Sequence, residues 1–308
     1  MNRQHIAMTV IKSARGLAAN TAIQKLPITT YLYKRVFRFG YRDPVVTTTF
    51  RRLSFSLPTT DVTIVPGLIG GFYEKLELDI FERLCTESRS IVDVGGNIGL
   101  YACIAAKQAP PATRIVTFEP APENIHYLRR NLATNGYGSR VEVVEKAVGN
   151  ATGTLKLFKA KDNIGTHSAS HRNAGSSTSF DIEMTSLDEF LGDELPDLIK
   201  IDVEGYDGFV LDGASRVISR CRPTLFVEFV PSHLQNCGYA PGRFIDLVFE
   251  NYEHVFMVDE PRSRLDRCVR FDLEQLGDSQ VNVNLVAVGR EDHLRIVEDL
   301  ESSRDSSS

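Results

Sequence analysis

The sequence predicts a doubly wound α/β fold built on a mostly parallel sheet, and three observations carry this prediction. First, from Ser90 onward, short apolar runs alternate with stretches of helical periodicity, which is typical of parallel strands joined by helices. Second, the segment Ser90–Tyr101 (SIVDVGGNIGLY) has the pattern of a buried strand, a glycine-rich turn and the start of a helix. Third, acidic residues directly follow several predicted strands, which places them at one edge of such a sheet.

The composition is that of a globular protein with room for one sizeable domain and additions at either end. The 308 residues are 42% hydrophobic and 24% charged. No apolar run reaches the ~18 residues that a transmembrane helix requires. The five cysteines show no C-x-x-C spacing, which favours reduced thiols in a cytoplasmic-type compartment over a disulfide framework or a structural zinc site.

Charge and patterning divide the chain into three parts. Residues 1–60 hold ten Lys and Arg residues against the single acid Asp43, although the formal net charge of the whole chain is −5. Residues 61–301 carry the α/β pattern and form the predicted main domain. The Ser-rich end, residues 302–308, is predicted to be disordered.

The basic amino-terminal segment predicts two amphipathic helices, one within the first twenty residues and one over Thr30–Phe39. Three roles remain open for them. The helices can dock on the chain's own domain or on a second subunit, they can contact an anionic membrane surface through residues 1–40, or they can form a cleavable organellar targeting peptide. The expected location is cytoplasmic, with peripheral contact at a membrane surface as the alternative.

The first part of the main domain alternates strands and helices. Phe50–Leu57 and Val62–Val65 are predicted as short strands or a hairpin, closed by Pro66-Gly67. The elements predicted next are the helix Glu74–Cys85, the strand at Ser90, the helix Leu100–Gln108, the strand Arg114–Phe118, the helix Pro122–Thr134 and the strand Val141–Glu145.

The pattern loosens and then returns. After a strand over Thr154–Phe158, the polar stretch Lys159–Ser179 shows little regular pattern, which suits either a lid or substrate loop or an ordinary surface excursion. Ser186 and Glu189 have capping-box spacing at the start of a short helix. The later elements are the strand Leu198–Asp202, the helix Tyr206–Arg220, the strand Pro223–Phe229, the helix Arg243–Glu250, the strands Val255–Val258 and Asn284–Val288, and the helix Glu291–Leu300.

The glycine-rich turn after Ser90 can bring backbone close to a ligand at a helix N-terminus. It is not the dinucleotide fingerprint G-x-G-x-x-G, because Asn97 and Leu100 stand where glycines are required. Glu119 ends the second strand 24 residues past Gly95, near the interval at which an acid meets the hydroxyls of a ribose. Asp93 and Asp202 also end strands, although an acid before a helix can serve as a cap instead.

These motifs together resemble the FkbM-type S-adenosylmethionine-dependent methyltransferases. The resemblance rests on VDVGGNIG at 92–99, FEP at 118–120, AVG at 147–149, SLDEFL at 186–191, LIKIDVEG at 198–205, VLDGA at 210–214 and RP at 222–223. It is strongest over residues 74–258 and implies a Rossmann-like class I methyltransferase fold with an antiparallel last strand.

The resemblance implies a cofactor site for S-adenosyl-L-methionine. Its members are Asp93, Gly95, Gly96, Asn97, Gly99, Glu119, Ala147 and Asp202. The glycine turn would wrap the methionine part, Glu119 would hold the ribose, and the backbone around Ala147 would flank the adenine. Asp202 would face the amino group or the reacting centre. Gly96 departs from the family, in which alanine is common at this position.

The function implied by the resemblance is O-methylation of a hydroxyl on a saccharide, a glycolipid or a small metabolite. The candidate bases are Asp202, Glu204 and Glu228 at strand ends, with His167 in the irregular stretch as a further candidate. No metal ion and no nucleic-acid partner are predicted, although the acids around Asp202 could host a divalent ion. Two alternatives remain: a catalytically silent scaffold of the same fold at a membrane surface, and a nicotinamide-dependent oxidoreductase, which Asn97 and Leu100 disfavour.

Overall fold

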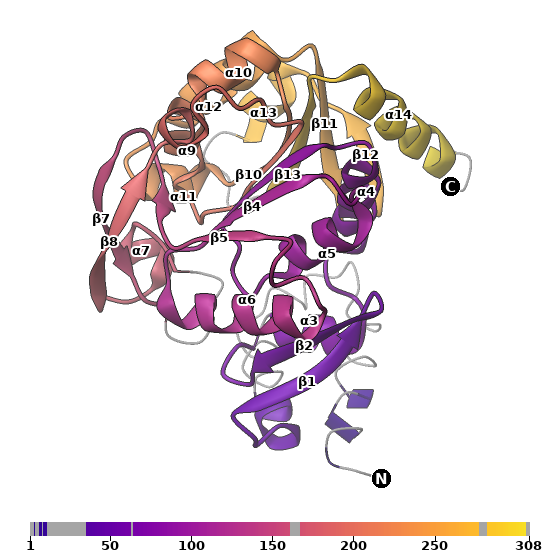
Figure 1. Ribbon diagram of the computed structural model, residues 1–308, viewed down its shortest axis with the longest axis vertical. Helices are drawn as coiled ribbons and strands as arrows, with labels where there is room; N and C mark the ends of the chain where they lie inside the picture. Colours follow the sequence, from indigo (N-terminus) through magenta and orange to yellow (C-terminus); the bar gives the residue numbers. More distant parts are fainter. Residues whose placement is uncertain are drawn as a thin grey trace. The chain divides into compact units, whose positions relative to one another are not determined.

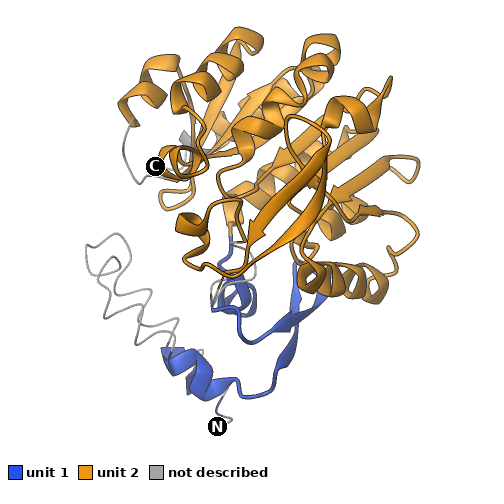
Figure 2. Ribbon diagram, turned by 90° about the vertical axis from the view of Figure 1, so that its left-hand side faces the viewer, with its two compact units in different colours: residues 1–73 blue, residues 74–308 orange. Residues whose placement is uncertain are grey.

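A computed structural model of the chain describes residues 3, 6–7, 9–10, 35–62, 64–160, 167–276 and 282–305. The chain divides into two compact units, Met1–Tyr73 and Glu74–Ser308 (Figure 2). Most of the predicted amino-terminal helices lies outside the described residues, so their role stays a prediction. Among the described residues, no helix combines the length and apolar composition needed to cross a membrane.

The first unit contains an antiparallel hairpin and a short helix. Strands β1 (Val45–Phe50) and β2 (Leu53–Pro58) pair through a two-residue turn, at which both arginines have positive φ. Helix α3 (Ile64–Gly70) follows, and the Asp61 carboxylate accepts a hydrogen bond from the Ile64 N–H at 2.8 Å. The prediction of a strand over Val62–Val65 is therefore wrong, because an acidic cap and an early proline favour a helix start there.

The second unit is built on an eight-stranded sheet in the order β12-β11-β13-β10-β9-β3-β4-β5 (Figure 1). Its strands are β3 (Ser90–Val94), β4 (Arg114–Phe118), β5 (Glu142–Val144), β9 (Leu198–Ile201), β10 (Thr224–Phe229), β11 (His254–Asp259), β12 (Arg264–Arg267) and β13 (Val283–Val288). Within this sheet the neighbouring strands β5, β4, β3, β9 and β10 run parallel, whereas β13 is antiparallel to both β10 and β11. The predicted mostly parallel sheet with an antiparallel last strand is confirmed.

Helices cover both faces of this sheet. They are α4 (Lys75–Thr86), α5 (Leu100–Gln108), α6 (Pro122–Thr134), α8 (Leu187–Leu191), α9 (Asp207–Asp212), α10 (Ser215–Cys221), α11 (Pro231–Asn236), α12 (Pro241–Asn251), α13 (Arg270–Leu276) and α14 (Glu291–Asp305). Phe226 of β10 packs against Phe81 of α4 and Tyr101 of α5. Its strand neighbour Val227 belongs to a cluster with residues of α9, α10 and α12, so the two faces have different helical partners.

A smaller sheet lies at one margin of the second unit, away from α4 and α14 (Figure 1). It pairs β6 (Ala147–Val148), β8 (Ser179–Thr185) and β7 (Gly153–Phe158) in that order, and helix α7 (His171–Ala174) lies between β7 and β8 in the chain. Strand β8 is absent from the sequence prediction. The apolar residues Phe180, Ile182 and Met184 alternate there with the exposed acids Asp181 and Glu183, so the segment does carry the period of a half-buried strand.

Two boundaries differ from the prediction. The helix predicted over Tyr206–Arg220 is two helices, α9 and α10, separated at Gly213. A Cβ at Gly213 would lie 2.0 Å from the carbonyl oxygen of Gly149, so a close backbone crossing breaks the helix at that point. Helix α14 runs to Asp305, past the predicted end at Leu300 and into the Ser-rich end of the chain.

Candidate functional site

The strand order places a ligand crevice between β3 and β9. From β3 the chain moves outward to β4 and β5, and it then returns to the other side of β3 with β9 and β10. At such a reversal, the loops after the two central strands diverge and leave a crevice at the carboxyl edge of the sheet. The turn after β3, Glu119 after β4 and Asp202 after β9 all lie at this edge.

The turn after β3 is held tightly against its neighbours. The N–H groups of Gly95 and Gly96 both donate to the carbonyl oxygen of Phe118, at 3.0 and 2.8 Å. Gly95 has φ of 94°, and a Cβ there would lie 2.0 Å from the carbonyl oxygen of Asp202. Glycine is therefore required at this position both by backbone conformation and by space.

The space around position 96 also favours glycine. A Cβ at this position would lie 2.3 Å from the hydroxyl oxygen of Thr117, and that hydroxyl donates to the buried Asp93 carboxylate at 2.9 Å. Alanine at position 96 would thus push against the Thr117–Asp93 hydrogen bond. Glycine at position 96 avoids this contact.

Glu119 joins the turn after β3 to the loop after β4. Its carboxylate is 5% exposed and accepts one hydrogen bond at each oxygen, from the Asn97 N–H at 2.7 Å and from the Ala121 N–H at 2.8 Å. Burial raises the pKa of Glu119 to about 7, against the lowering effect of these two bonds and of a third from the Asn124 side chain. A carboxylate offers about four acceptor positions, so one remains for a ligand.

Asp93, Lys200 and Asp202 form a charged group below the turn. Asp93 is fully buried; burial raises its pKa, while Lys200 and the Thr117 hydroxyl oppose that rise. The Lys200 ammonium lies 3.1 Å from the Asp202 carboxylate and 4.3 Å from the centre of the Tyr101 ring. Neighbouring acids, Asp202 first among them, raise the pKa of Lys200 despite the opposing effect of its burial. This amine is therefore charged, and it partly neutralises the two aspartates.

Glu204 and Glu228 meet a third residue, His233, that is not predicted from the sequence. Glu204 stands in the turn after β9 with φ of 53°, and its Oε2 lies 3.6 Å from Nδ1 of His233 in α11. The turn is braced by Asp207, whose carboxylate accepts from the N–H groups of Val203 and Gly205. Burial, followed by the charges of neighbouring acids, raises the pKa of Glu204 and of Glu228 well above the ordinary value.

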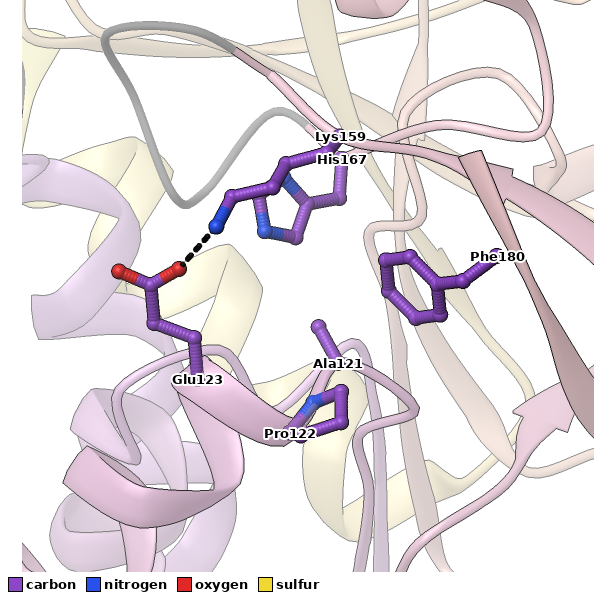
Figure 3. A pocket seen from close by; sticks show the side chains of 6 residues that line it. All are labelled: Ala121, Pro122, Glu123, Lys159, His167 and Phe180. Atoms are coloured by element: carbon purple, nitrogen blue, oxygen red, sulfur yellow. Dashed lines mark hydrogen bonds and ion pairs between the residues drawn. The ribbon is translucent and has the colours of Figure 1, made fainter. Parts of the chain in front are cut away.

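A cavity of about 260 Å³ lies beside the loop that follows Glu119. It is lined by Ala121, Pro122, Glu123, Lys159, His167 and Phe180. Figure 3 shows the Phe180 ring on one side and the ion pair of Lys159 with Glu123, at 2.8 Å, on the other. The cavity therefore combines apolar walls with a charged rim.

His167 lines this cavity and does not join the group of acids at Glu204. Its Nδ1 accepts a hydrogen bond from the Ala160 N–H at 3.1 Å, which leaves the proton of the neutral ring on Nε2. Burial lowers the pKa of His167, and its charged neighbours are Glu123 and Lys159. A histidine held in this way donates at Nε2, so the interpretation of His167 as a base is not favoured.

Ala147 lies close to the same loop. It is buried in β6, in an apolar cluster with Ala121, Leu157, Ile182 and Met184. The predicted adenine-flanking segment and the loop after Glu119 therefore share one core.

A known family model matches the part of the chain that contains this site. The family model "Methyltransferase FkbM domain" matches residues 93–264, which is more than half of the chain. The chain belongs to the FkbM methyltransferase domain family. The matched range contains every predicted cofactor and catalytic residue, and it also contains His233.

Two curated relatives of this FkbM chain are named methyltransferases. "Methyltransferase sdnD" of Sordaria araneosa is 32% identical over 155 residues, which are 40% of this chain and 59% of the relative. "Methyltransferase 1" of Beauveria bassiana is 28% identical over 145 residues, 40% of this chain and 57% of the relative. The chain thus spans less than two thirds of the length of either relative.

Solved structures with a similar fold include two methyltransferases. The "Methyltransferase FkbM" of Methylobacillus flagellatus matches 73% of this chain and 53% of its own, with 16% identity and a TM-score of 0.41. An O-methyltransferase from Bacillus cereus, solved in complex with SAH, matches 75% of this chain and 84% of its own, with 16% identity and a TM-score of 0.39.

The structure of this FkbM chain brings most of the predicted site together and adds three residues. Asp93, the glycine turn, Glu119 and Asp202 meet at the crevice, with Glu204 and Glu228 beyond Asp202. The added residues are Lys200, Asp207 and His233. A lysine inside the apolar strand Leu198–Ile201 is a sequence signal, and Pro231 ahead of His233 marks a helix start.

Proposed function

We propose that this chain is an S-adenosyl-L-methionine-dependent O-methyltransferase whose acceptor is a hydroxyl on a saccharide, a glycolipid or another small metabolite. The observation that carries the proposal is the linkage of the Gly95–Gly99 turn to Glu119 through the Asn97 N–H, at the reversal point of a sheet with an antiparallel inserted strand. Membership of the FkbM family supports the reaction class.

The residues present fit the cofactor. Asp93 Oδ1 and Asn97 Oδ1 are buried and have no hydrogen-bond partner within the described part of the chain, so both are available to polar groups of a ligand. Glu119 accepts three hydrogen bonds within the chain and retains one acceptor position for a ribose hydroxyl. Asp93 and Asp202 supply negative charge that suits a ligand carrying an amino group and a sulfonium. We assign the adenine to the cavity beside Ala121, because the Ala121 N–H binds Glu119.

The chain's own residues have two tasks in the reaction. When bound, the cofactor supplies a methyl group on a positively charged sulfur. The protein must orient the acceptor hydroxyl for in-line attack, and it must take up the proton of that hydroxyl. Glu204 and Glu228 suit the second task, because their raised pKa values make them stronger bases than an ordinary carboxylate. Asp202 is ion-paired with Lys200, so we assign it to the cofactor's amino group.

The proposal is tested by offering the chain and methyl-labelled S-adenosyl-L-methionine to a mixture of metabolites, followed by mass spectrometry of labelled products. Transfer of label to a hydroxyl-bearing compound is expected. Binding of the cofactor without transfer to any acceptor would favour the scaffold alternative. Glu145 is an exposed acid paired with Arg129, away from the proposed site, so the control variant Glu145→Gln should transfer label as the wild type does.

A further inference from the structure

Three potential metal ligands converge from separate elements of the second unit. Glu204 comes from the turn after β9, Glu228 from β10 and His233 from α11. One ligand atom of each lies within 4.8 Å of the other two, and Glu204 Oε2 lies 3.6 Å from His233 Nδ1. The sequence predicts no metal site here, because the three residues follow no local ligand spacing and meet only through the fold.

Two of these ligand atoms lack a partner. Glu228 Oε2 and His233 Nδ1 are buried and make no hydrogen bond to any described residue. The other oxygen of Glu228 accepts from the Asn282 amide at 2.8 Å, which fixes the orientation of the carboxylate. Because buried polar atoms in folded proteins are nearly always paired, these two atoms are available to a ligand.

Charge and geometry favour a cation as that partner. Asp202 and Asp207 add negative charge around the cluster, while the nearby Lys200 ammonium is paired with Asp202. Two ligands bound to one metal ion at about 2.1 Å lie about 3.0–3.4 Å apart, so the Glu204–His233 distance needs little adjustment. An imidazole nitrogen beside two carboxylates suits Mn²⁺ or Zn²⁺ better than the all-oxygen preference of Mg²⁺ and Ca²⁺.

We propose that Glu204, Glu228 and His233 bind a divalent transition-metal ion such as Mn²⁺ or Zn²⁺ through two carboxylate oxygens and one imidazole nitrogen. Three protein ligands leave coordination positions open, as in metal sites that bind a substrate. Glu204 follows Asp202 by two residues, so an acceptor oxygen can fill an open position. With the ion bound, Glu204 and Glu228 would act as its ligands, and the ion would make the acceptor hydroxyl lose its proton more readily, in place of the base role assigned above to the free carboxylates. Only this last role rests on the proposed methyl transfer; the binding of the ion does not.

The test is metal binding to the full-length, untagged, metal-stripped chain. Mn²⁺ is titrated and its free fraction followed by electron paramagnetic resonance, with Zn²⁺ titrated calorimetrically and Mg²⁺ as the comparison ion. We expect one Mn²⁺ or Zn²⁺ per chain and much weaker binding of Mg²⁺. The His233→Ala and Glu228→Gln variants are each expected to weaken binding by at least about tenfold. The His126→Ala variant removes an exposed histidine of α6 and should bind as the wild type does.

Circular dichroism establishes that each variant is folded, and thermal unfolding of the wild type gives an independent readout, because an ion that binds only the folded state raises the Tm. Absence of saturable Mn²⁺ and Zn²⁺ binding by the folded wild type would overturn the proposal. Unchanged affinity in both folded variants would do so as well. Calorimetry with S-adenosyl-L-methionine on the metal-free chain separates this outcome from failure of the proposed function.

Discussion

Replacing Glu119 with glutamine should weaken cofactor binding while leaving the side chain's size unchanged. The carboxylate accepts from the N–H groups of Asn97 and Ala121 and from the Asn124 side chain, and its remaining acceptor position is assigned to the ribose. An amide has one oxygen in place of two. The loss of one charge-assisted hydrogen bond costs about 1.5–3 kcal/mol, which corresponds to about ten- to a hundredfold weaker binding of S-adenosyl-L-methionine.

The same side chain predicts a pH dependence of binding. The pKa of Glu119 is raised to about 7 by burial, and a ribose hydroxyl binds the ionised form. Below pH 7 the free protein must release a proton on binding, so affinity falls by up to about tenfold for each further pH unit. Above pH 7 the affinity is constant. Glutamine does not titrate, so the variant should lose this dependence.

Stability responds to Glu119 in the opposite sense. In the unfolded chain the pKa of this carboxyl is near its ordinary value of 4.5, and in the folded chain the pKa is about 7. The folded state therefore holds more protons between these values. The contribution of Glu119 to the free energy of unfolding is fully present below pH 4.5. It decreases by about 3 kcal/mol in total as the pH rises through 7.

The assay is isothermal titration of the wild type and Glu119→Gln with S-adenosyl-L-methionine at pH 6, 7 and 8, with Glu145→Gln as the control. The assignment of Glu119 to the ribose would be refuted by a folded variant that binds with wild-type affinity. A pH dependence that persists in the variant would show that another group titrates.

Three further changes test the site. Gly95→Ala should lower the free energy of unfolding, measured in urea, by more than about 3 kcal/mol, because the new Cβ would lie 2.0 Å from the Asp202 carbonyl oxygen. Gly136 has a similar φ of 78° but open space around it, so the control variant Gly136→Ala should lower that free energy by only about 1 kcal/mol. Lys200→Met leaves Asp93 and Asp202 without their cation, so stability should drop by about 3–5 kcal/mol. The loss should become smaller as the pH is lowered, because burial raises the pKa of Asp93, and a loss that does not change with pH would contradict the ion pairing. Glu228→Gln should lower the rate of methyl transfer about a hundredfold or more, while the affinity for S-adenosyl-L-methionine in calorimetry stays within about twofold of the wild type. An equally large loss of affinity would instead place Glu228 in the cofactor site.

Much of the central sheet is predictable, because buried parallel strands leave a strong signal in the sequence. Ile91 to Val94, Ile115 to Phe118 and Leu198 to Ile201 are nearly continuous apolar runs, and each is followed by an acid or a glycine turn. Since parallel strands end at the same edge, the meeting of Asp93, Glu119 and Asp202 follows from the strand pattern alone.

The remaining features depend on tertiary contacts that leave no local signal. The break between α9 and α10 arises from the crossing of Gly213 over Gly149. His233 reaches Glu204 only because the short helix α11 folds back over the turn after β9. The amine of Lys200 lies beside the acids of the crevice, an environment that the apolar run Leu198–Ile201 does not reveal.

The central claim is that the crevice between β3 and β9 binds S-adenosyl-L-methionine. Isothermal titration of the full-length chain with S-adenosyl-L-methionine and, separately, with NAD tests it most directly. The geometry of the Gly95–Gly99 turn, Asp93 and Glu119 predicts saturable one-to-one binding of the first ligand and none of the second. Binding of NAD in place of S-adenosyl-L-methionine, or binding of neither, would contradict the account.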